Sequence, residues 1–86
     1  MELPVILPGE YQTLCRLSVR NGAGLNFQKQ EHRLSAYERI SIKEVKYLSV
    51  SVWGKTKEAW ICMYMNHTFY VEKCRNYETV KPDISL

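Results

Sequence analysis

Residues 17–27 read LSVRNGAGLNF, and this short segment combines the signals of a strand and of a turn. Leu17 and Val19 alternate with polar residues, which is the period of a half-buried β-strand. Gly22 and Gly24 follow, and glycine tolerates the positive φ angles that tight turns require. A dinucleotide-binding loop would need a third glycine and a following helix, and neither is found here. The segment therefore predicts a strand that runs into a turn.

The same alternation recurs on both sides of this segment. Residues 11–20 place Cys15, Leu17 and Val19 on the more apolar face, which predicts that this face points inward. No convincing helical period is present, so five or six short β-segments predict a small all-β barrel or curled sheet. The other segments are ERISIKEVK with Ile40 and Ile42 on one face, LSVSVW with Leu48, Val50 and Val52, AWICMYM, and TFYVEK.

The ends of the chain and one internal segment lack this pattern. Pro4 and Pro8 make residues 1–10 an extended lead-in rather than a helix. Residues 25–36 are polar and irregular, which indicates a long surface loop. We expect the barrel to span residues 11–73, with an added strand near 67–73, and a polar tail to occupy residues 74–86.

Length and composition limit the classes of function. Eighty-six residues make one domain with a small core, and the net charge is only +3. Lysines and arginines are scattered, so nucleic acid is not an expected partner, and no apolar run is long enough to enter a membrane. Three cysteines without a C-x-x-C pair indicate free thiols. We expect a cytoplasmic protein if the 86 residues are the whole chain, and a cell-envelope location if they belong to an exported one.

Catalytic, metal and phosphate sites find little support in the sequence. The WGKT segment matches the end of a P-loop, but Ser49 stands where its upstream glycine would be. His32 and His67 are far apart, and no cysteines form the close pairs of a zinc site. Cys62 or Cys15 with His67 could form a nucleophile and base, yet no nucleophile signature surrounds them. We expect a non-enzymatic protein with no metal and no cofactor.

Aromatic residues make up 12% of the chain and indicate a binding surface. A small barrel rarely buries ten aromatic side chains, so several are expected to line a groove. Such grooves bind peptides or sugars by stacking, and single-stranded nucleic acid is the less favoured alternative.

Three segments together resemble the bacterial SH3 domain family (SH3b). LSVRNGAGLNF is similar to the L-N-V-R and S-G-P/A-G start of those domains, through Leu17, Val19, Arg20, Gly22, Gly24 and Phe27. YERISIKEV resembles the family's K-G-x-x-V-x-I strand, and VWGKTKEAWICMYM resembles its closing hairpin. The order and spacing of the segments agree over roughly residues 11–65. The chain departs from the family at Ala59, where glycine is usual, and runs about twenty residues beyond the family's normal end.

The resemblance implies an SH3-like barrel of five to six antiparallel strands with a C-terminal extension, acting as a non-catalytic binding module. Such domains target cell walls, so the implied ligand is a peptidoglycan peptide bound in an aromatic groove. The implied groove residues are Asn26, Phe27, Tyr37, Tyr47 and Trp53.

The rival hypothesis is an intracellular module of phage or mobile-element type that binds a protein partner. The free cysteines and the lack of a signal peptide favour this rival. The strand near 67–73 could complete the barrel, cover an edge, or form a homodimer with a second copy.

Overall fold

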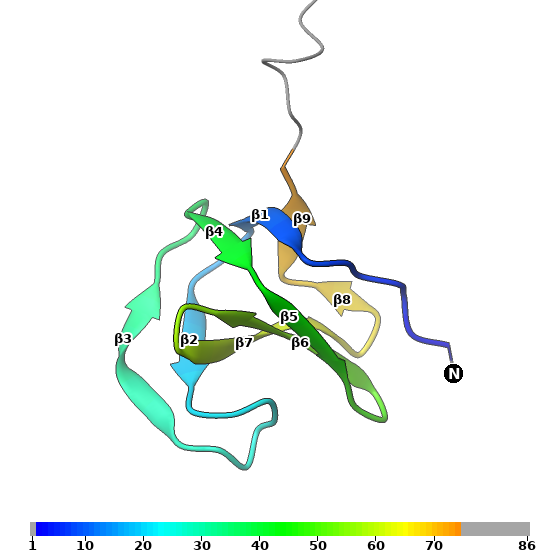
Figure 1. The fold of residues 1–86 in the computed structure, drawn as a ribbon, viewed down its shortest axis with the longest axis horizontal. Coiled ribbons are helices and arrows are strands. Elements are labelled where there is room, and N and C mark those ends of the chain that lie inside the picture. Colours follow the sequence, from blue (N-terminus) through cyan, green and yellow to red (C-terminus); the bar gives the residue numbers. More distant parts are fainter. Residues whose placement is uncertain (1, 75–86) are drawn as a thin grey trace, which may run out of the picture.

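The computed structural model describes residues 2–74, and all of their regular structure is strand (Figure 1). The fold is therefore all-β, as the alternation predicts, and none of the described residues forms a helix that could span a membrane. The number of strands exceeds the five or six that were expected, because bends divide several segments. The nine strands are β1 Gly9–Thr13, β2 Leu17–Arg20, β3 Lys29–Leu34, β4 Arg39–Ile42, β5 Glu44–Tyr47, β6 Ser51–Thr56, β7 Ala59–Met65, β8 Thr68–Phe69 and β9 Val71–Lys73.

The strands form two antiparallel sheets that meet at a corner. The smaller sheet has the order β4-β1-β9, and the larger has the order β3-β2-β7-β6-β5 with β8 paired to β7. At the corner the chain passes from β4 to β5 through Lys43, whose N–H donates to the Lys55 carbonyl at 2.8 Å. Figure 1 shows β1 and β9 side by side, beside the strands of the larger sheet. This arrangement is a curled, barrel-like sheet.

The core fills the space between the two sheets. Val19, Val52, Ile61 and Met63 are almost completely buried there. Gly54 is packed so closely beneath the Met63 sulfur that a Cβ would overlap it, so this position requires glycine. Much of the rest of the core comes from alternate residues of β2, β4 and β7, with Ile6, Tyr11, Leu34 and Val71 added from other segments. Leu17 and Val19 are buried, as predicted, and Cys15 is partly buried against the core. Ile40 and Ile42 lie on one face, as predicted, and that face is buried.

A buried threonine hydroxyl joins the small sheet to the turn that precedes β4. Thr13 is fully buried, and its hydroxyl donates to the Ser35 carbonyl at 2.6 Å. The same oxygen accepts the N–H of Glu38 at 2.9 Å. The buried Thr13 hydroxyl would otherwise be unpaired, and its two hydrogen bonds fix the 35–38 turn against β1.

Two local predictions were wrong, each for an identifiable reason. The polar region 25–36 contains β3, which pairs with β2 through Leu17 opposite Leu34, so only its first part is a loop. Its exposed side chains follow no apolar alternation, and the pairing partner determines its conformation. LSVSVW is not one strand, because a hairpin turn at residues 48–50 separates β5 from β6. The strand β1 also begins at Gly9, inside the expected lead-in, and residues 75–86 of the expected tail lie outside the described residues.

Two neighbouring valines test this correction. Val52 is 0% exposed and Val50 is 45% exposed. We expect Val52→Ala to lower the free energy of unfolding by about 2 kcal/mol, because it removes two buried methyl groups and leaves a cavity. The matched change Val50→Ala should stay within about 0.5 kcal/mol. Urea unfolding of both variants measures the difference, and equal losses would contradict the hairpin turn.

Candidate functional site

An extended segment precedes β1 and is attached to the barrel by one side chain. Ile6 is 6% exposed and joins the core, whereas its neighbours Val5 and Leu7 are 82% and 63% exposed. Pro4 and Pro8 flank these three residues and disfavour helical backbone. The segment therefore lies on the barrel with only its central side chain buried.

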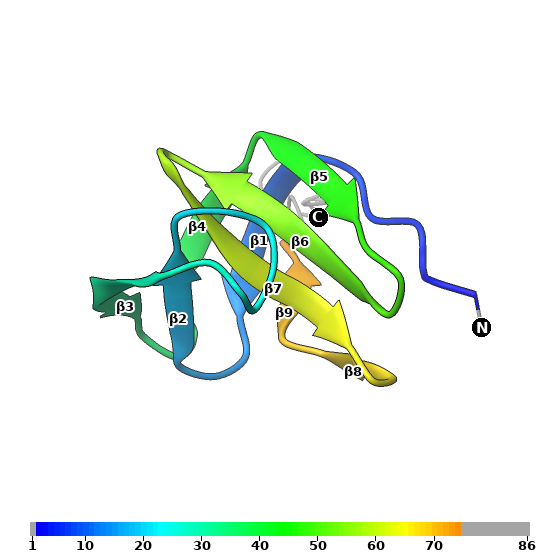
Figure 2. The same cartoon turned by 90° about the horizontal axis from the view of Figure 1, so that it is seen from below.

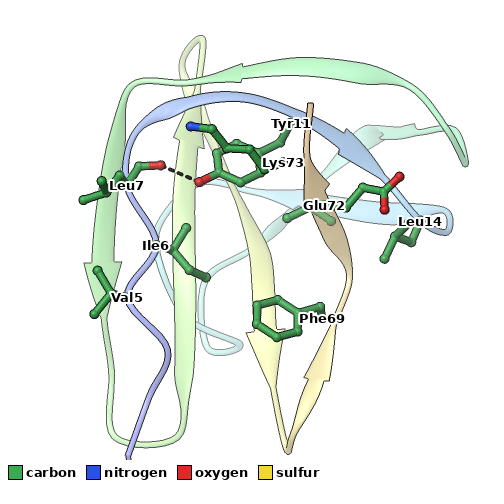
Figure 3. Close-up of a pocket in the computed structure, with 9 residues that line it drawn as sticks. Val5, Ile6, Leu7, Tyr11, Leu14, Phe69, Glu72 and Lys73 are labelled. Carbon is green, nitrogen blue, oxygen red and sulfur yellow. Dashed lines mark hydrogen bonds between the residues drawn. The ribbon is translucent and has the colours of Figure 1, made fainter. Parts of the chain in front are cut away.

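Two tyrosine hydroxyls hold the backbone of this segment. The Tyr47 hydroxyl accepts the Ile6 N–H at 3.0 Å and donates to the Ile6 carbonyl, also at 3.0 Å. The Tyr11 hydroxyl donates to the Leu7 carbonyl at 2.6 Å, which Figure 3 marks with a dashed line. Burial raises the pKa of Tyr11, partly offset by the bond to Leu7, so this phenol stays a donor at neutral pH.

An apolar groove lies between this N-terminal segment and the β8–β9 region. Its volume is about 570 Å³, within the range of ligand pockets. Figure 3 shows Ile6 reaching into the space from one wall and Phe69 from the other. Phe69 is 49% exposed and packs edge-on against Tyr64, with 4.8 Å between the ring centroids. The lining residues are Val5, Ile6, Leu7, Tyr11, Leu14, Phe69, Val71, Glu72 and Lys73.

Charge is confined to one end of the apolar groove. The Lys73 ammonium lies 5.3 Å from the centroid of the Tyr11 ring, a distance at which a cation is attracted to the face of the ring. It also occupies the space that a Cβ on Gly9 would need, at 2.8 Å. Gly9 has a φ of +152°, so the backbone favours glycine there, whereas the flexible end of the lysine could move aside. Glu72, also on the rim, is exposed.

A second depression, the polar pocket, lies between β3, β4 and the β6–β7 turn. Its volume is about 340 Å³. Val19, Leu34 and Ile40 form an apolar floor, and charged side chains stand around it. These charged or titratable residues are His32, Glu38, Arg39, Lys43, Lys57 and Glu58. Since both signs are interspersed, the polar pocket presents no single charge to a ligand.

The predicted site residues do not form one groove. Tyr47 is next to the apolar groove, but its hydroxyl is occupied by Ile6. Tyr37 is 69% exposed in the 35–38 turn, with a φ of 64°, and lines none of the depressions described here. Trp53 is only 1% exposed, and its indole N–H donates to the Ser51 hydroxyl at 2.9 Å. Its ring is therefore not a free stacking surface, which corrects the role that the sequence suggested for it.

Phe27 and Asn26 belong to the loop that follows β2. Phe27 is 43% exposed and rests on Gly22 so closely that a Cβ there would overlap the ring. This contact explains Gly22, whereas Gly24 does adopt a φ of +149°. Figure 2 shows the loop crossing in front of β6 and β7, and its Leu25 shares a small hollow with Trp53. Leu25 and Phe27 of this loop both keep exposed side chains, at 61% and 43%.

The geometry gives little support for a catalytic cysteine or for a metal site. Burial raises the pKa of the Cys62 thiol to about 11, so the thiolate is scarce at neutral pH. Within residues 2–74, no three histidine, cysteine or acidic side chains gather as metal ligands would.

Comparisons with protein-family models, curated proteins and solved structures find no match to this chain.

The apolar groove was not predicted from the sequence. Its walls come from segments far apart in the chain, around residues 5–7 and 69–73. The signal that the sequence does contain is the apolar run at residues 5–7 between Pro4 and Pro8, in the segment predicted to be an extended lead-in.

Removing one hydroxyl tests how the N-terminal wall is held. We expect Tyr47→Phe to free the Ile6 backbone, to accelerate hydrogen exchange of the Ile6 amide, and to lower the free energy of unfolding by about 1 kcal/mol. Tyr37→Phe is the matched control, because that ring is exposed in a distant turn, and it should change neither quantity. Exchange measured by NMR decides the point, and an Ile6 amide unaffected in Tyr47→Phe would contradict the tyrosine contact.

Proposed function

We propose that this chain is a non-catalytic binding module that takes an extended, apolar-rich segment of a partner protein into the apolar groove. The observation that carries the proposal is the groove itself. Ile6 and the half-exposed Phe69 face each other across a space of about 570 Å³. Exposed apolar residues gathered around one concave surface are typical of protein-binding sites.

The shape of the groove favours an extended ligand. Its N-terminal wall is an extended backbone and its other wall runs from Phe69 into the strand β9. Both walls present apolar side chains, so a bound segment would bury apolar residues against each of them. Burial of this kind contributes about 25 cal/mol for each Å² of apolar surface removed from water.

A cell-wall peptide is the second candidate ligand, and a separate surface supports it. The resemblance of residues 11–65 to SH3b domains points to the 21–28 loop, where Phe27 is 43% exposed beside the exposed Asn26. Neither residue lines the apolar groove. The two hypotheses therefore place the ligand on different surfaces, and variants can separate them.

A reciprocal pair of variants tests the proposed function. Phe69→Ser alters the apolar groove, and Phe27→Ser removes a ring of similar exposure, 43% against 49%, from the loop. Wild-type protein should select apolar-rich peptides from a displayed random library. We expect these peptides to bind Phe69→Ser at least tenfold more weakly, because truncating an aromatic anchor costs about 2 kcal/mol or more. Phe27→Ser should bind them unchanged, and circular dichroism checks that both variants fold.

The same two variants test the cell-wall candidate. Binding to insoluble peptidoglycan sacculi that is lost in Phe27→Ser and kept in Phe69→Ser would favour the loop and contradict the groove. Selected peptides that bind Phe69→Ser as well as wild type would also contradict the proposal.

A further inference from the structure

The strand β9 has one paired edge and one open edge. It pairs with β1 in the smaller sheet, and among residues 2–74 no strand pairs with its other side. The open edge borders the apolar groove, since Val71, Glu72 and Lys73 all line it. An open strand edge next to an apolar surface is the arrangement that accepts an added strand.

The hydrogen bonds of β9 show which of its backbone groups are used. The Leu14 N–H donates to the Tyr70 carbonyl at 2.9 Å, and the Cys74 N–H donates to the Glu10 carbonyl at 3.0 Å. In an antiparallel pair, the residues that point toward the partner strand alternate. Glu72 lies midway between Tyr70 and Cys74, so its N–H and carbonyl also point toward β1.

The intervening residues, Val71 and Lys73, therefore direct their N–H and carbonyl groups toward the open edge. No backbone hydrogen bond within the described part of the chain uses these groups. They provide two donors and two acceptors at the spacing of an antiparallel ladder. An incoming strand could satisfy all four with two of its own residues.

Side-chain direction then defines what the incoming strand must carry. Val71 lies opposite Thr13 and Lys73 opposite Tyr11, on the inward face of the smaller sheet. An incoming residue paired with Val71 would direct its side chain to the same face, toward Phe69 and the apolar groove. This position favours an apolar residue.

The residue opposite Glu72 would lie on the other face, beside an exposed carboxylate.

A second copy of this chain is a poor occupant of the open edge of β9. If two copies paired so that Val71 and Lys73 were both satisfied, Glu72 of one copy would lie directly opposite Glu72 of the other. Like charges in that position are destabilising, whereas a lysine or arginine opposite Glu72 is favourable.

We propose that β9 accepts an extended segment of a partner protein as an added antiparallel strand, with a basic residue opposite Glu72 and an apolar residue, next in the partner's sequence, opposite Val71. This inference rests on the proposed function and specifies how the partner is recognised. Backbone bonds to Val71 and Lys73 hold the segment, and the basic and apolar side chains set its register.

A designed peptide tests the inference on the full chain. The probe is a capped peptide of sequence TVKVTVT, whose lysine would lie opposite Glu72 and whose next valine would lie opposite Val71. We expect N-methylation of that valine to weaken binding at least tenfold, because its N–H donates to β9. N-methylation of the lysine, whose N–H points away from β9, is the matched control and should leave binding almost unchanged. Isothermal titration calorimetry measures all three affinities.

A charge exchange gives an independent measure of register. We expect Glu72→Lys to weaken binding of the probe about threefold to fivefold. A second probe, with glutamate in place of the lysine, should bind Glu72→Lys about as tightly as the original probe binds the wild type. Glu44→Lys, an exposed change in β5, controls for net charge and should have little effect.

Three results would overturn the inference. The first is equal binding of the two N-methylated probes. If Phe69→Ser still abolished binding in that case, the groove would remain the docking site and only strand addition would fail. The second is failure of the probe to bind at all. The third is a dimer of the free protein, seen by sedimentation, that the probe disperses, since a second copy would then be the occupant of the edge.

Discussion

The position of β1 in the middle of the smaller sheet is the constraint on which the binding surface depends. A strand has two edges, and β1 uses one for β4 and the other for β9. Its alternate residues serve the two partners in turn. Among residues 2–74, β9 is paired on one side only. No strand of the larger sheet pairs with β9 in the described part of the chain, so the barrel keeps a seam between β9 and that sheet. The apolar groove is this seam, bordered by the N-terminal segment.

The N-terminal segment narrows the seam without closing it. Ile6 is buried in the core, and the Tyr47 hydroxyl holds both polar groups of the Ile6 backbone. Val5 and Leu7 remain exposed because their side chains point away from that anchor. The anchored Ile6 side chain thus supplies an apolar wall of fixed position, which is what a preorganised binding site requires.

The sequence predicts a strand well where apolar residues alternate and one face is buried. It predicts a strand less well where only hydrogen bonding to a neighbouring strand makes the segment extended. Leu17 and Val19 were correctly predicted to face inward, because they lie in a strand with one buried face. The strand β3 has almost no apolar pattern and exists because β2 lies beside it. Trp53 shows why the site residues are harder to predict than the strands. An aromatic residue in a strand can pack in the core or contact a ligand, and only the structure shows that Trp53 is buried.

Amide hydrogen exchange of β9 tests the central claim, the open edge, most directly. The account predicts fast exchange at Val71 and Lys73, whose N–H groups point into the seam, and slow exchange at Glu72, whose N–H is bonded to β1. NMR resolves the three residues individually in the full chain. Exchange at Val71 and Lys73 as slow as at Glu72 would mean that the edge is already paired, and it would contradict both the seam and the partner strand inferred from it.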